Sequence, residues 1–125
     1  MDFNDTNRAI YLQIADDISD RVLTGALPPD ERVPSVREYA ATVMVNVNTV
    51  MRAYDHLQSL GIIYNRRGLG YFVAPGGAEK VAADRRAAFI EGGGLERMFK
   101  QLSLLGIGPK ELSEMYDSFI SNSAE

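Results

Sequence analysis

The chain has 125 residues, no cysteine, one histidine and a formal net charge of -4. The lack of cysteine excludes a disulfide framework and a thiolate zinc site, and a single histidine excludes a multi-histidine metal site within one chain. No apolar run approaches the roughly 20 residues that a membrane span needs, and the N-terminus lacks the basic-then-apolar order of a signal peptide. We therefore expect a soluble, cytoplasmic protein that holds no cofactor. Its length allows one compact domain with a short appendage, small enough to gain from dimerisation.

The charges are unevenly distributed along the sequence. Residues 1–31 contain seven acidic residues and two arginines, whereas residues 32–73 contain five arginines and two acidic residues. The net charge alone argues against a nucleic-acid partner, but a phosphate backbone responds to the local field more than to the whole-chain sum. We therefore expect residues 32–73 to form a basic face, with the acidic first helix pointing away from it.

The first predicted helix spans about Ile10 to Leu23. Apolar side chains recur there at helical spacing and form a core-facing stripe of Tyr11, Ile14, Ala15, Ile18 and Val22. Asp16, Asp17 and Asp20 are expected on the solvent side. Gly25 ends the helix, and residues 27–34 form a proline-rich connector.

Residues 34–61 predict two helices joined by a tight turn. Ser35 and Glu38 stand at the spacing of a capping box, which begins a helix over about residues 36–43. After a break near Met44, Asn46 can cap a second helix, and Gly61 suits the left-handed turn that follows its end.

A β-hairpin is predicted after these helices. Residues 62–64 and 71–73 are two β-prone runs, and the tip between them contains Arg66, Arg67, Gly68 and Gly70. Glycines let the backbone approach a minor groove closely, and arginine suits its negative potential. A helix-turn-helix followed by a basic hairpin is a winged helix, which places DNA binding first among the possible functions.

The second helix of the pair offers candidates for base contact. Asn48 and Arg52 point away from its buried side, with Thr49 at the flank, in the half of the helix that enters a major groove in helix-turn-helix proteins. Asparagine can bond adenine N6 and N7, and arginine can bond guanine O6 and N7. The alternative is a solvated helix face with Asn46 as a plain cap. Arg37 has two readings as well: a phosphate contact, or a salt bridge to a carboxylate of the first helix.

The chain changes character after Val73. Residues 74–77 predict a linker, residues 78–90 a helix, and residues 92–94 a glycine break before two more helices, the last beginning at Pro109. One chain offers too little surface to cover the apolar side chains of the last two helices, so we expect these helices to pair with a second copy. The predicted contacts are Phe99, Leu102, Met115, Tyr116 and Phe119. The expected fold class is mainly α with a small β-hairpin, comprising a winged helix-turn-helix domain over residues 1–75 and a short helical dimerisation region over residues 76–125.

Three motifs, VPSVREYA (33–40), NVNTVMRAYDHLQSLGII (46–63) and RRGLGYFV (66–73), together resemble the DNA-binding domain of the GntR family of bacterial transcription regulators. IYLQIADDI and LTGAL, further upstream, fit that family's first helix. The resemblance covers roughly residues 8–74 and implies that Arg37 touches DNA. With it, we expect DNA contacts from Ser35, Arg37, Asn46, Asn48, Thr49, Arg52, Arg66, Arg67, Gly68 and Gly70. Two departures are Val47, where proline is common, and Leu69, where the wing often has a lysine that would contact phosphate.

The short tail resembles the YtrA-type branch of that family, in which a small C-terminal region mediates dimerisation. The resemblance implies a homodimeric, sequence-specific repressor that binds a palindromic operator in double-stranded DNA. An enzyme is not expected, because no phosphate-cradling loop, Ser-His-Asp set or paired carboxylates stand out. Two alternatives stay open. One is a winged helix whose arginines bind an acidic protein partner, and the other is a ligand sensor with an effector site between the tail helices.

Overall fold

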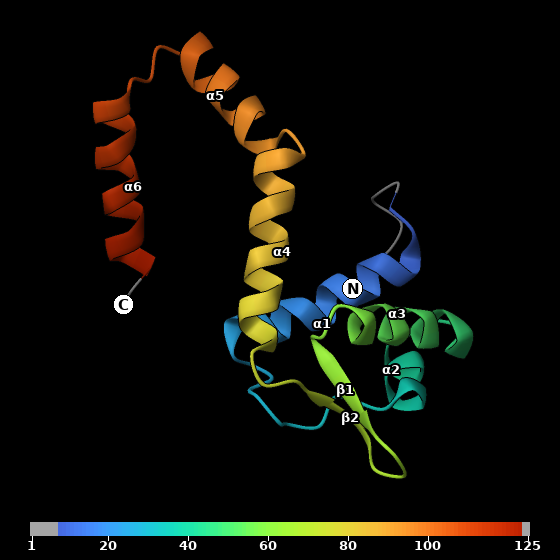
Figure 1. Cartoon of the computed structure of the whole chain (residues 1–125). Coiled ribbons are helices and arrows are strands. Elements are labelled where there is room, and N and C mark those ends of the chain that lie inside the picture. The colour runs from blue at the N-terminus through green and yellow to red at the C-terminus, as the bar shows by residue number, and fades with distance from the viewer. Residues whose placement is uncertain (1–7, 124–125) are drawn as a thin grey trace. The chain divides into compact units, whose positions relative to one another are not determined.

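Figure 1 shows the computed structural model of the chain, which describes residues 8–123. Its elements are α1 (Ile10–Thr24), α2 (Val36–Val43), α3 (Val47–Ser59), β1 (Ile63–Arg66), β2 (Gly70–Val73), α4 (Gly77–Glu91), α5 (Gly94–Leu104) and α6 (Pro109–Ser123). The predicted fold class, mainly α with a small β-hairpin, is confirmed. None of the helices described is both long enough and apolar enough to cross a membrane.

Contacts divide the chain into two compact units, Met1–Asp84 and Arg85–Glu125, and the division falls within α4. The first unit includes the start of α4 because Val81 is only 2% exposed and belongs to its core. The domain boundary expected between residues 75 and 76 stays a prediction, and the compact packing itself continues to Asp84.

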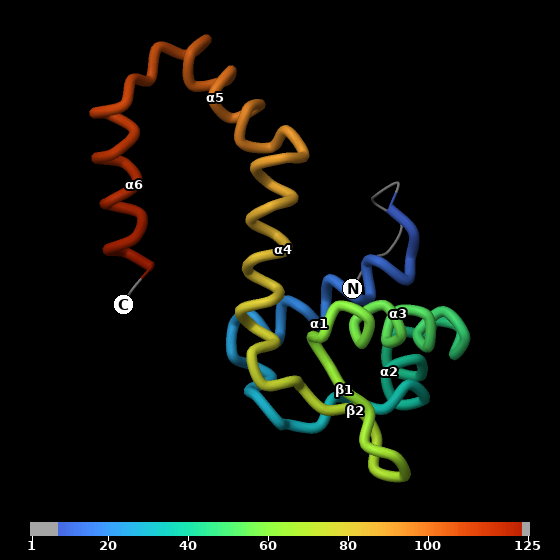
Figure 2. Tube along the Cα trace, in the orientation of Figure 1, coloured from blue at the N-terminus to red at the C-terminus, as the bar shows by residue number. Residues whose placement is uncertain are grey.

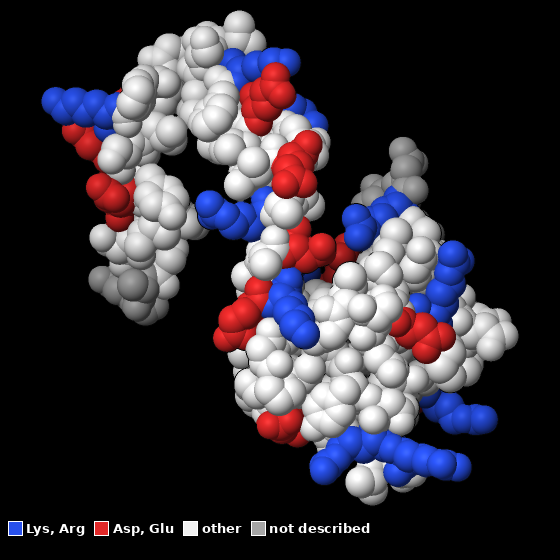
Figure 3. All heavy atoms as spheres, viewed as in Figure 1, with Lys and Arg blue, Asp and Glu red and all other residues white. Residues whose placement is uncertain are grey.

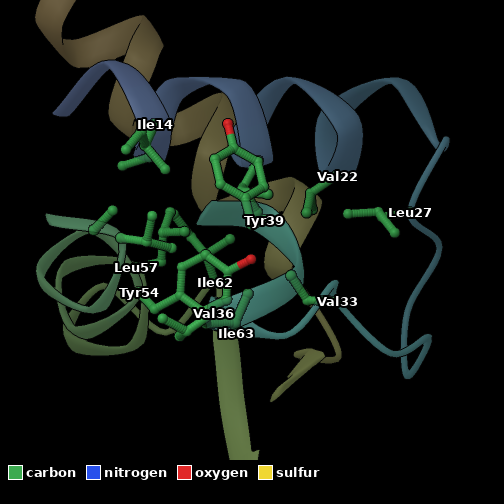
Figure 4. Packing of buried hydrophobic residues seen from close by; sticks show 14 of the residues in the cluster. Ile14, Val22, Leu27, Val33, Val36, Tyr39, Tyr54, Leu57, Ile62 and Ile63 are labelled. Atoms are coloured by element: carbon green, nitrogen blue, oxygen red, sulfur yellow. The ribbon is translucent and has the colours of Figure 1, made fainter. Parts of the chain in front are cut away.

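The core of the first unit lies among α1, α2, α3 and the hairpin (Figures 2 and 4). Ile14 and Ile18 of α1 are fully buried, as are Val50 and Tyr54 of α3. The helix α3 contacts α1, α2 and β1, so it is the central element of the unit. The apolar stripe predicted on α1 is confirmed for its four buried members, while Tyr11 lies half-buried at the edge of the core.

Local hydrogen bonds set the helix ends that the sequence predicted. The Ser35 side chain accepts a bond of 3.1 Å from the Glu38 N–H, and the Asn46 side chain accepts one of 2.7 Å from the Asn48 N–H. Met44 takes a left-handed φ of 58° in the turn between α2 and α3. Gly61 has a φ of 75° after the end of α3, a conformation in which glycine avoids the strain of a side chain.

The proline-rich connector adds a third segment to the hairpin. The strands β1 and β2 are antiparallel, and the connector pairs with β2 through an isolated bridge between Arg32 and Phe72. The Val33 N–H donates to the Tyr71 carbonyl at 2.8 Å, and the Val73 N–H donates to the Glu31 carbonyl at 2.9 Å. The connector therefore fixes one edge of the hairpin, a role that its sequence did not predict.

The expectation that all three aspartates of α1 face solvent is wrong for Asp17. Its carboxylate is half-buried and accepts bonds from the Tyr39 hydroxyl at 2.7 Å and from the Arg21 guanidinium at 3.0 Å. The Tyr54 hydroxyl donates to the Pro34 carbonyl at 2.6 Å. These bonds tie α2 to α1 and the start of α2 to α3, which fixes the helix-turn-helix.

Alkaline pH should destabilise this unit through its buried tyrosines. Burial raises the pKa values of Tyr39 and Tyr54 above the ordinary value of tyrosine. The hydrogen bond to Asp17 raises the pKa of Tyr39 further. The resulting stability is fully present below about pH 10 and is lost as pH rises toward the folded-state pKa, because only the unfolded chain then releases these protons. Above about pH 10, the unfolding free energy should fall by about 1.4 kcal/mol per pH unit for each of the two tyrosines.

Denaturant unfolding between pH 8 and 11.5 measures this slope. Tyr39→Phe removes one of the two titrating hydroxyls and should reduce the slope by about 1.4 kcal/mol per pH unit. An unchanged slope in this variant would show that alkaline sensitivity arises elsewhere.

In the second unit, α5 and α6 contain no buried residue. Pro109 begins α6, as predicted. The corner between α4 and α5 is tight, because a Cβ on Gly94 would lie 2.7 Å from the ring of Phe89. The tail therefore has defined helices but no core of its own within the residues described.

Candidate nucleic-acid interface

The first turn of α3 presents polar groups at the surface. Asn46 and Asn48 are exposed and Thr49 is half-buried. The Asn46 side-chain oxygen is engaged in the helix cap, whereas the Asn48 side chain forms no hydrogen bond within residues 8–123. The amide of Asn48 is thus available for a base edge, which can use its donor and acceptor as a pair.

Arg52 is exposed but packs on the first helix. Its guanidinium carbon lies 3.9 Å from the centre of the Tyr11 ring, and the same ring meets His56 edge-on at 6.1 Å. A hollow of about 420 Å³ beside this stack is lined partly by Asn48 and Thr49. The structure therefore brings Arg52 together with the polar first turn of α3, on the side of the helix that faces α1.

The first turn of α2 presents Arg37. This side chain is exposed and forms no ion pair within the residues described. Among these residues Arg37 therefore does not form the salt bridge to the first helix that was the alternative prediction. Asp17 of that helix pairs with Arg21 instead. Ser35, the residue just before α2, is half-buried and caps the helix with its side-chain oxygen.

The wing is the turn between β1 and β2. Arg66 lies opposite Gly70 at the end of the ladder, and the Leu69 N–H donates to the Arg66 carbonyl at 2.8 Å to close the turn. Gly68 and Gly70 have φ values of 79° and 113°, which other residues rarely adopt. Arg66 and Arg67 are both exposed, and the guanidinium carbon of Arg66 lies 5.5 Å from the centre of the Phe72 ring.

Arg32 joins the wing to α2, a role that the sequence did not predict. Its guanidinium pairs with Glu38 of the first turn of α2 at 3.5 Å. A Cβ on Gly70 would lie 3.4 Å from Arg32 Nε, so the same side chain also lies against the base of the wing. The only sequence signal was its place among the five arginines of residues 32–73.

A second contact joins the hairpin to α3. The Tyr71 hydroxyl of β2 lies 3.9 Å from the Met51 sulfur, and the Tyr71 ring packs edge-on against Tyr54 at 5.2 Å. In Figure 3, basic side chains project from the lower edge of the first unit, where Figure 1 places the hairpin. The wing, the start of α2 and α3 are thus held together by side-chain contacts.

This arrangement defines a class of protein. Exposed arginines on α2 and on the wing are suited to contact phosphates and fix the register of a duplex, and the polar groups in the first turn of α3 are suited to contact base edges in a major groove. The fold and the site are those of a winged helix-turn-helix DNA-binding domain.

Known sequences identify the family. The profile of the bacterial regulatory proteins of the gntR family matches residues 10–73. The HTH-type transcriptional regulator YhcF of Bacillus subtilis is 40% identical over 115 residues, which cover 91% of this chain and 92% of YhcF. The HTH-type transcriptional repressor YtrA of the same species is 40% identical over 65 residues, 52% of this chain and 50% of YtrA. The chain belongs to the GntR family of bacterial transcription regulators, as its motifs predicted.

Solved structures support the same assignment. The structure of a GntR-family transcriptional regulator from Bacteroides thetaiotaomicron has 47% sequence identity and a TM-score of 0.72, covering 92% of this chain and 99% of that one. The DNA-binding domain of AraR in complex with its operator ORR3 has 33% identity and a TM-score of 0.50, covering 51% and 77%. The winged helix-turn-helix with a helical C-terminal region is thereby confirmed.

Proposed function

We propose that this regulator is a homodimeric repressor that binds a palindromic operator. The main observation is the set of exposed arginines Arg37, Arg66 and Arg67. They lie on α2 and on the wing, two elements that Arg32 joins through Glu38 and Gly70. The name of YtrA as a repressor and the operator complex of AraR support the proposal. A dimer on a palindrome places two copies of α3 about one helical turn, roughly 34 Å, apart.

The proposed dimer contact is the apolar face of the tail. Four apolar side chains are exposed: Phe99 of α5 (53%), and Met115, Tyr116 and Phe119 of α6 (55%, 61% and 65%). Leu102, three residues after Phe99 in α5, is half-buried. A monomer rarely leaves a contiguous group of large apolar side chains in water. Because α5 and α6 bury no residue of their own, a second copy would supply the missing core by a two-fold contact.

The arginines provide the test of DNA binding. Arg37→Ala and Arg67→Ala should each weaken operator binding roughly tenfold, because each loses a charge-assisted bond to phosphate. Fluorescence anisotropy with an operator selected from a random duplex pool measures the affinity, and circular dichroism checks the fold. Lys100→Ala removes the same charge from α5 and should leave the affinity unchanged.

Two outcomes would contradict the proposal. A variant that unfolds would make its arginine structural. A parent protein that binds no duplex, but captures an acidic protein through the same arginines, would favour the protein-interaction module.

Ligand sensing is a second candidate function for the tail. It is favoured by a hollow of about 310 Å³ lined from α5 to the start of α6 by mostly apolar residues, among them Phe99, Leu102, Ile107 and Leu112. A thermal-shift screen of small apolar molecules would detect an effector as a raised Tm, and Leu112→Trp, which fills the hollow, should abolish that shift.

A further inference from the structure

The recognition helix α3 exposes an apolar stripe that its packing does not require. Val47 is 41% exposed and Met51 is 40% exposed. Residues four apart on a helix lie one above the other on the same side, so the two form a continuous strip. Within residues 8–123 the side chains of this strip have one polar contact, with the Tyr71 hydroxyl, which lies 3.9 Å from the Met51 sulfur.

The core already has its own residues on α3. Val50, Ala53, Tyr54 and Leu57 are buried and fill the space toward α1 and α2. The other exposed positions of this helix are polar, namely Asn48, Arg52, Asp55, Gln58 and Ser59. The apolar stripe is therefore an exception confined to the first half of the helix, the half that enters a major groove.

Only one base offers an apolar group in the major groove, which is the C5 methyl of thymine. The branched methyls of Val47 and the flexible thioether of Met51 suit contact with such a group. We propose that Val47 and Met51 recognise a thymine methyl in each operator half-site, beside an adenine bonded by Asn48. This inference rests on the proposed function, because it requires α3 to lie in a major groove.

Contacts around the stripe favour this occupant over another protein. Exposed arginines lie on α2 and on the wing after β1, two elements that contact α3, and would hold phosphates beside the groove. The Met51 sulfur contacts the hydroxyl of Tyr71, which lies in β2, the strand that follows the wing. The same strand therefore holds both the wing, for phosphate contact, and Met51, for methyl contact.

Replacing thymine with deoxyuridine tests the proposal, because it removes only the C5 methyl. In the selected operator, each thymine is replaced in turn and the affinity is measured by anisotropy. The parent should lose about three- to fivefold affinity at one or more positions of each half-site, the value of one buried methyl group. Val47→Ala or Met51→Ala should bind both duplexes equally at that position.

Leu60→Ala is the matched control. Leu60 is 40% exposed and lies just beyond the opposite end of α3, so this variant loses a similar apolar surface and should keep the parental response to deoxyuridine. Val47→Thr serves as a second variant that keeps the branched shape and should show a reduced response.

The outcomes separate this inference from the proposed function. A parent that binds its operator but ignores every deoxyuridine substitution would overturn the inference and leave the repressor proposal standing. A response that persists in both Val47→Ala and Met51→Ala would also overturn it, because another residue would then contact the methyl. Failure of the parent to select any duplex would overturn both.

Discussion

Removal of residues 85–125 should leave a folded monomer whose affinity for a palindromic operator is lower by roughly a hundred- to ten-thousand-fold. In the proposed dimer, binding of one half-site presents the second winged helix to the other half-site at a high effective concentration. The truncated chain loses this advantage without losing any DNA-contacting residue. Sedimentation measures its mass, and anisotropy measures its affinity for the full palindrome.

The position of the cut decides whether this experiment is clean. A chain ending at Asp84 retains Val81, which is 2% exposed in the core of the first unit. A cut after Pro75 would remove Val81 and lower the affinity through unfolding as well. A duplex with a single half-site is the internal control, because the parent and the truncated chain should bind it equally per winged helix.

A point variant distinguishes loss of the interface from loss of the tail. Phe119→Glu places a charge on a side chain that is 65% exposed, so it should leave α6 folded and still disrupt an apolar contact with a second copy. Phe119→Leu keeps the apolar character and should remain a dimer. A truncated chain that still sediments as a dimer would move the interface to the winged helix itself.

The elements of the fold were predictable because their signals are local. The caps at Ser35 and Asn46 use hydrogen bonds that span two or three residues, and the sequence contains both partners side by side. The third edge of the hairpin was not predictable, because it pairs Arg32 with Phe72 across 40 residues. Nothing local in a proline-rich connector indicates which distant strand it will join.

The sequence predicted most of the residues of the candidate interface, but not how their side chains lie. A helical wheel places Arg52 on the outer side of α3, but a long side chain with a charged end can bend back onto a nearby aromatic ring, as it does on Tyr11 at 3.9 Å. The sequence did not predict Val47 and Met51 as surface residues. Apolar residues in a helix usually indicate its buried side, and only the burial of the structure shows that these two remain at the surface.

Operator affinity should fall steeply with salt even though the net charge is -4. Arg37, Arg66 and Arg67 of both protomers would neutralise about six phosphates, and each contributes roughly -0.9 to the slope of log affinity against log salt. The expected slope is therefore about -5, or roughly a thousandfold loss between 50 and 200 mM salt. Titrations at four or more salt concentrations measure it.

Leu69→Lys provides a gain in the same measurement. Leu69 is 60% exposed at the tip of the wing, so a lysine there would add one phosphate contact per protomer without disturbing the core. The slope should steepen by about two units for the dimer, and binding should tighten on all sequences alike, because phosphate contacts contain no sequence information. Leu69→Gln, polar but uncharged, should leave the slope unchanged. A slope near zero in the parent, with no response to Leu69→Lys, would mean that the arginines meet no phosphate backbone, and an acidic protein partner would then explain them better.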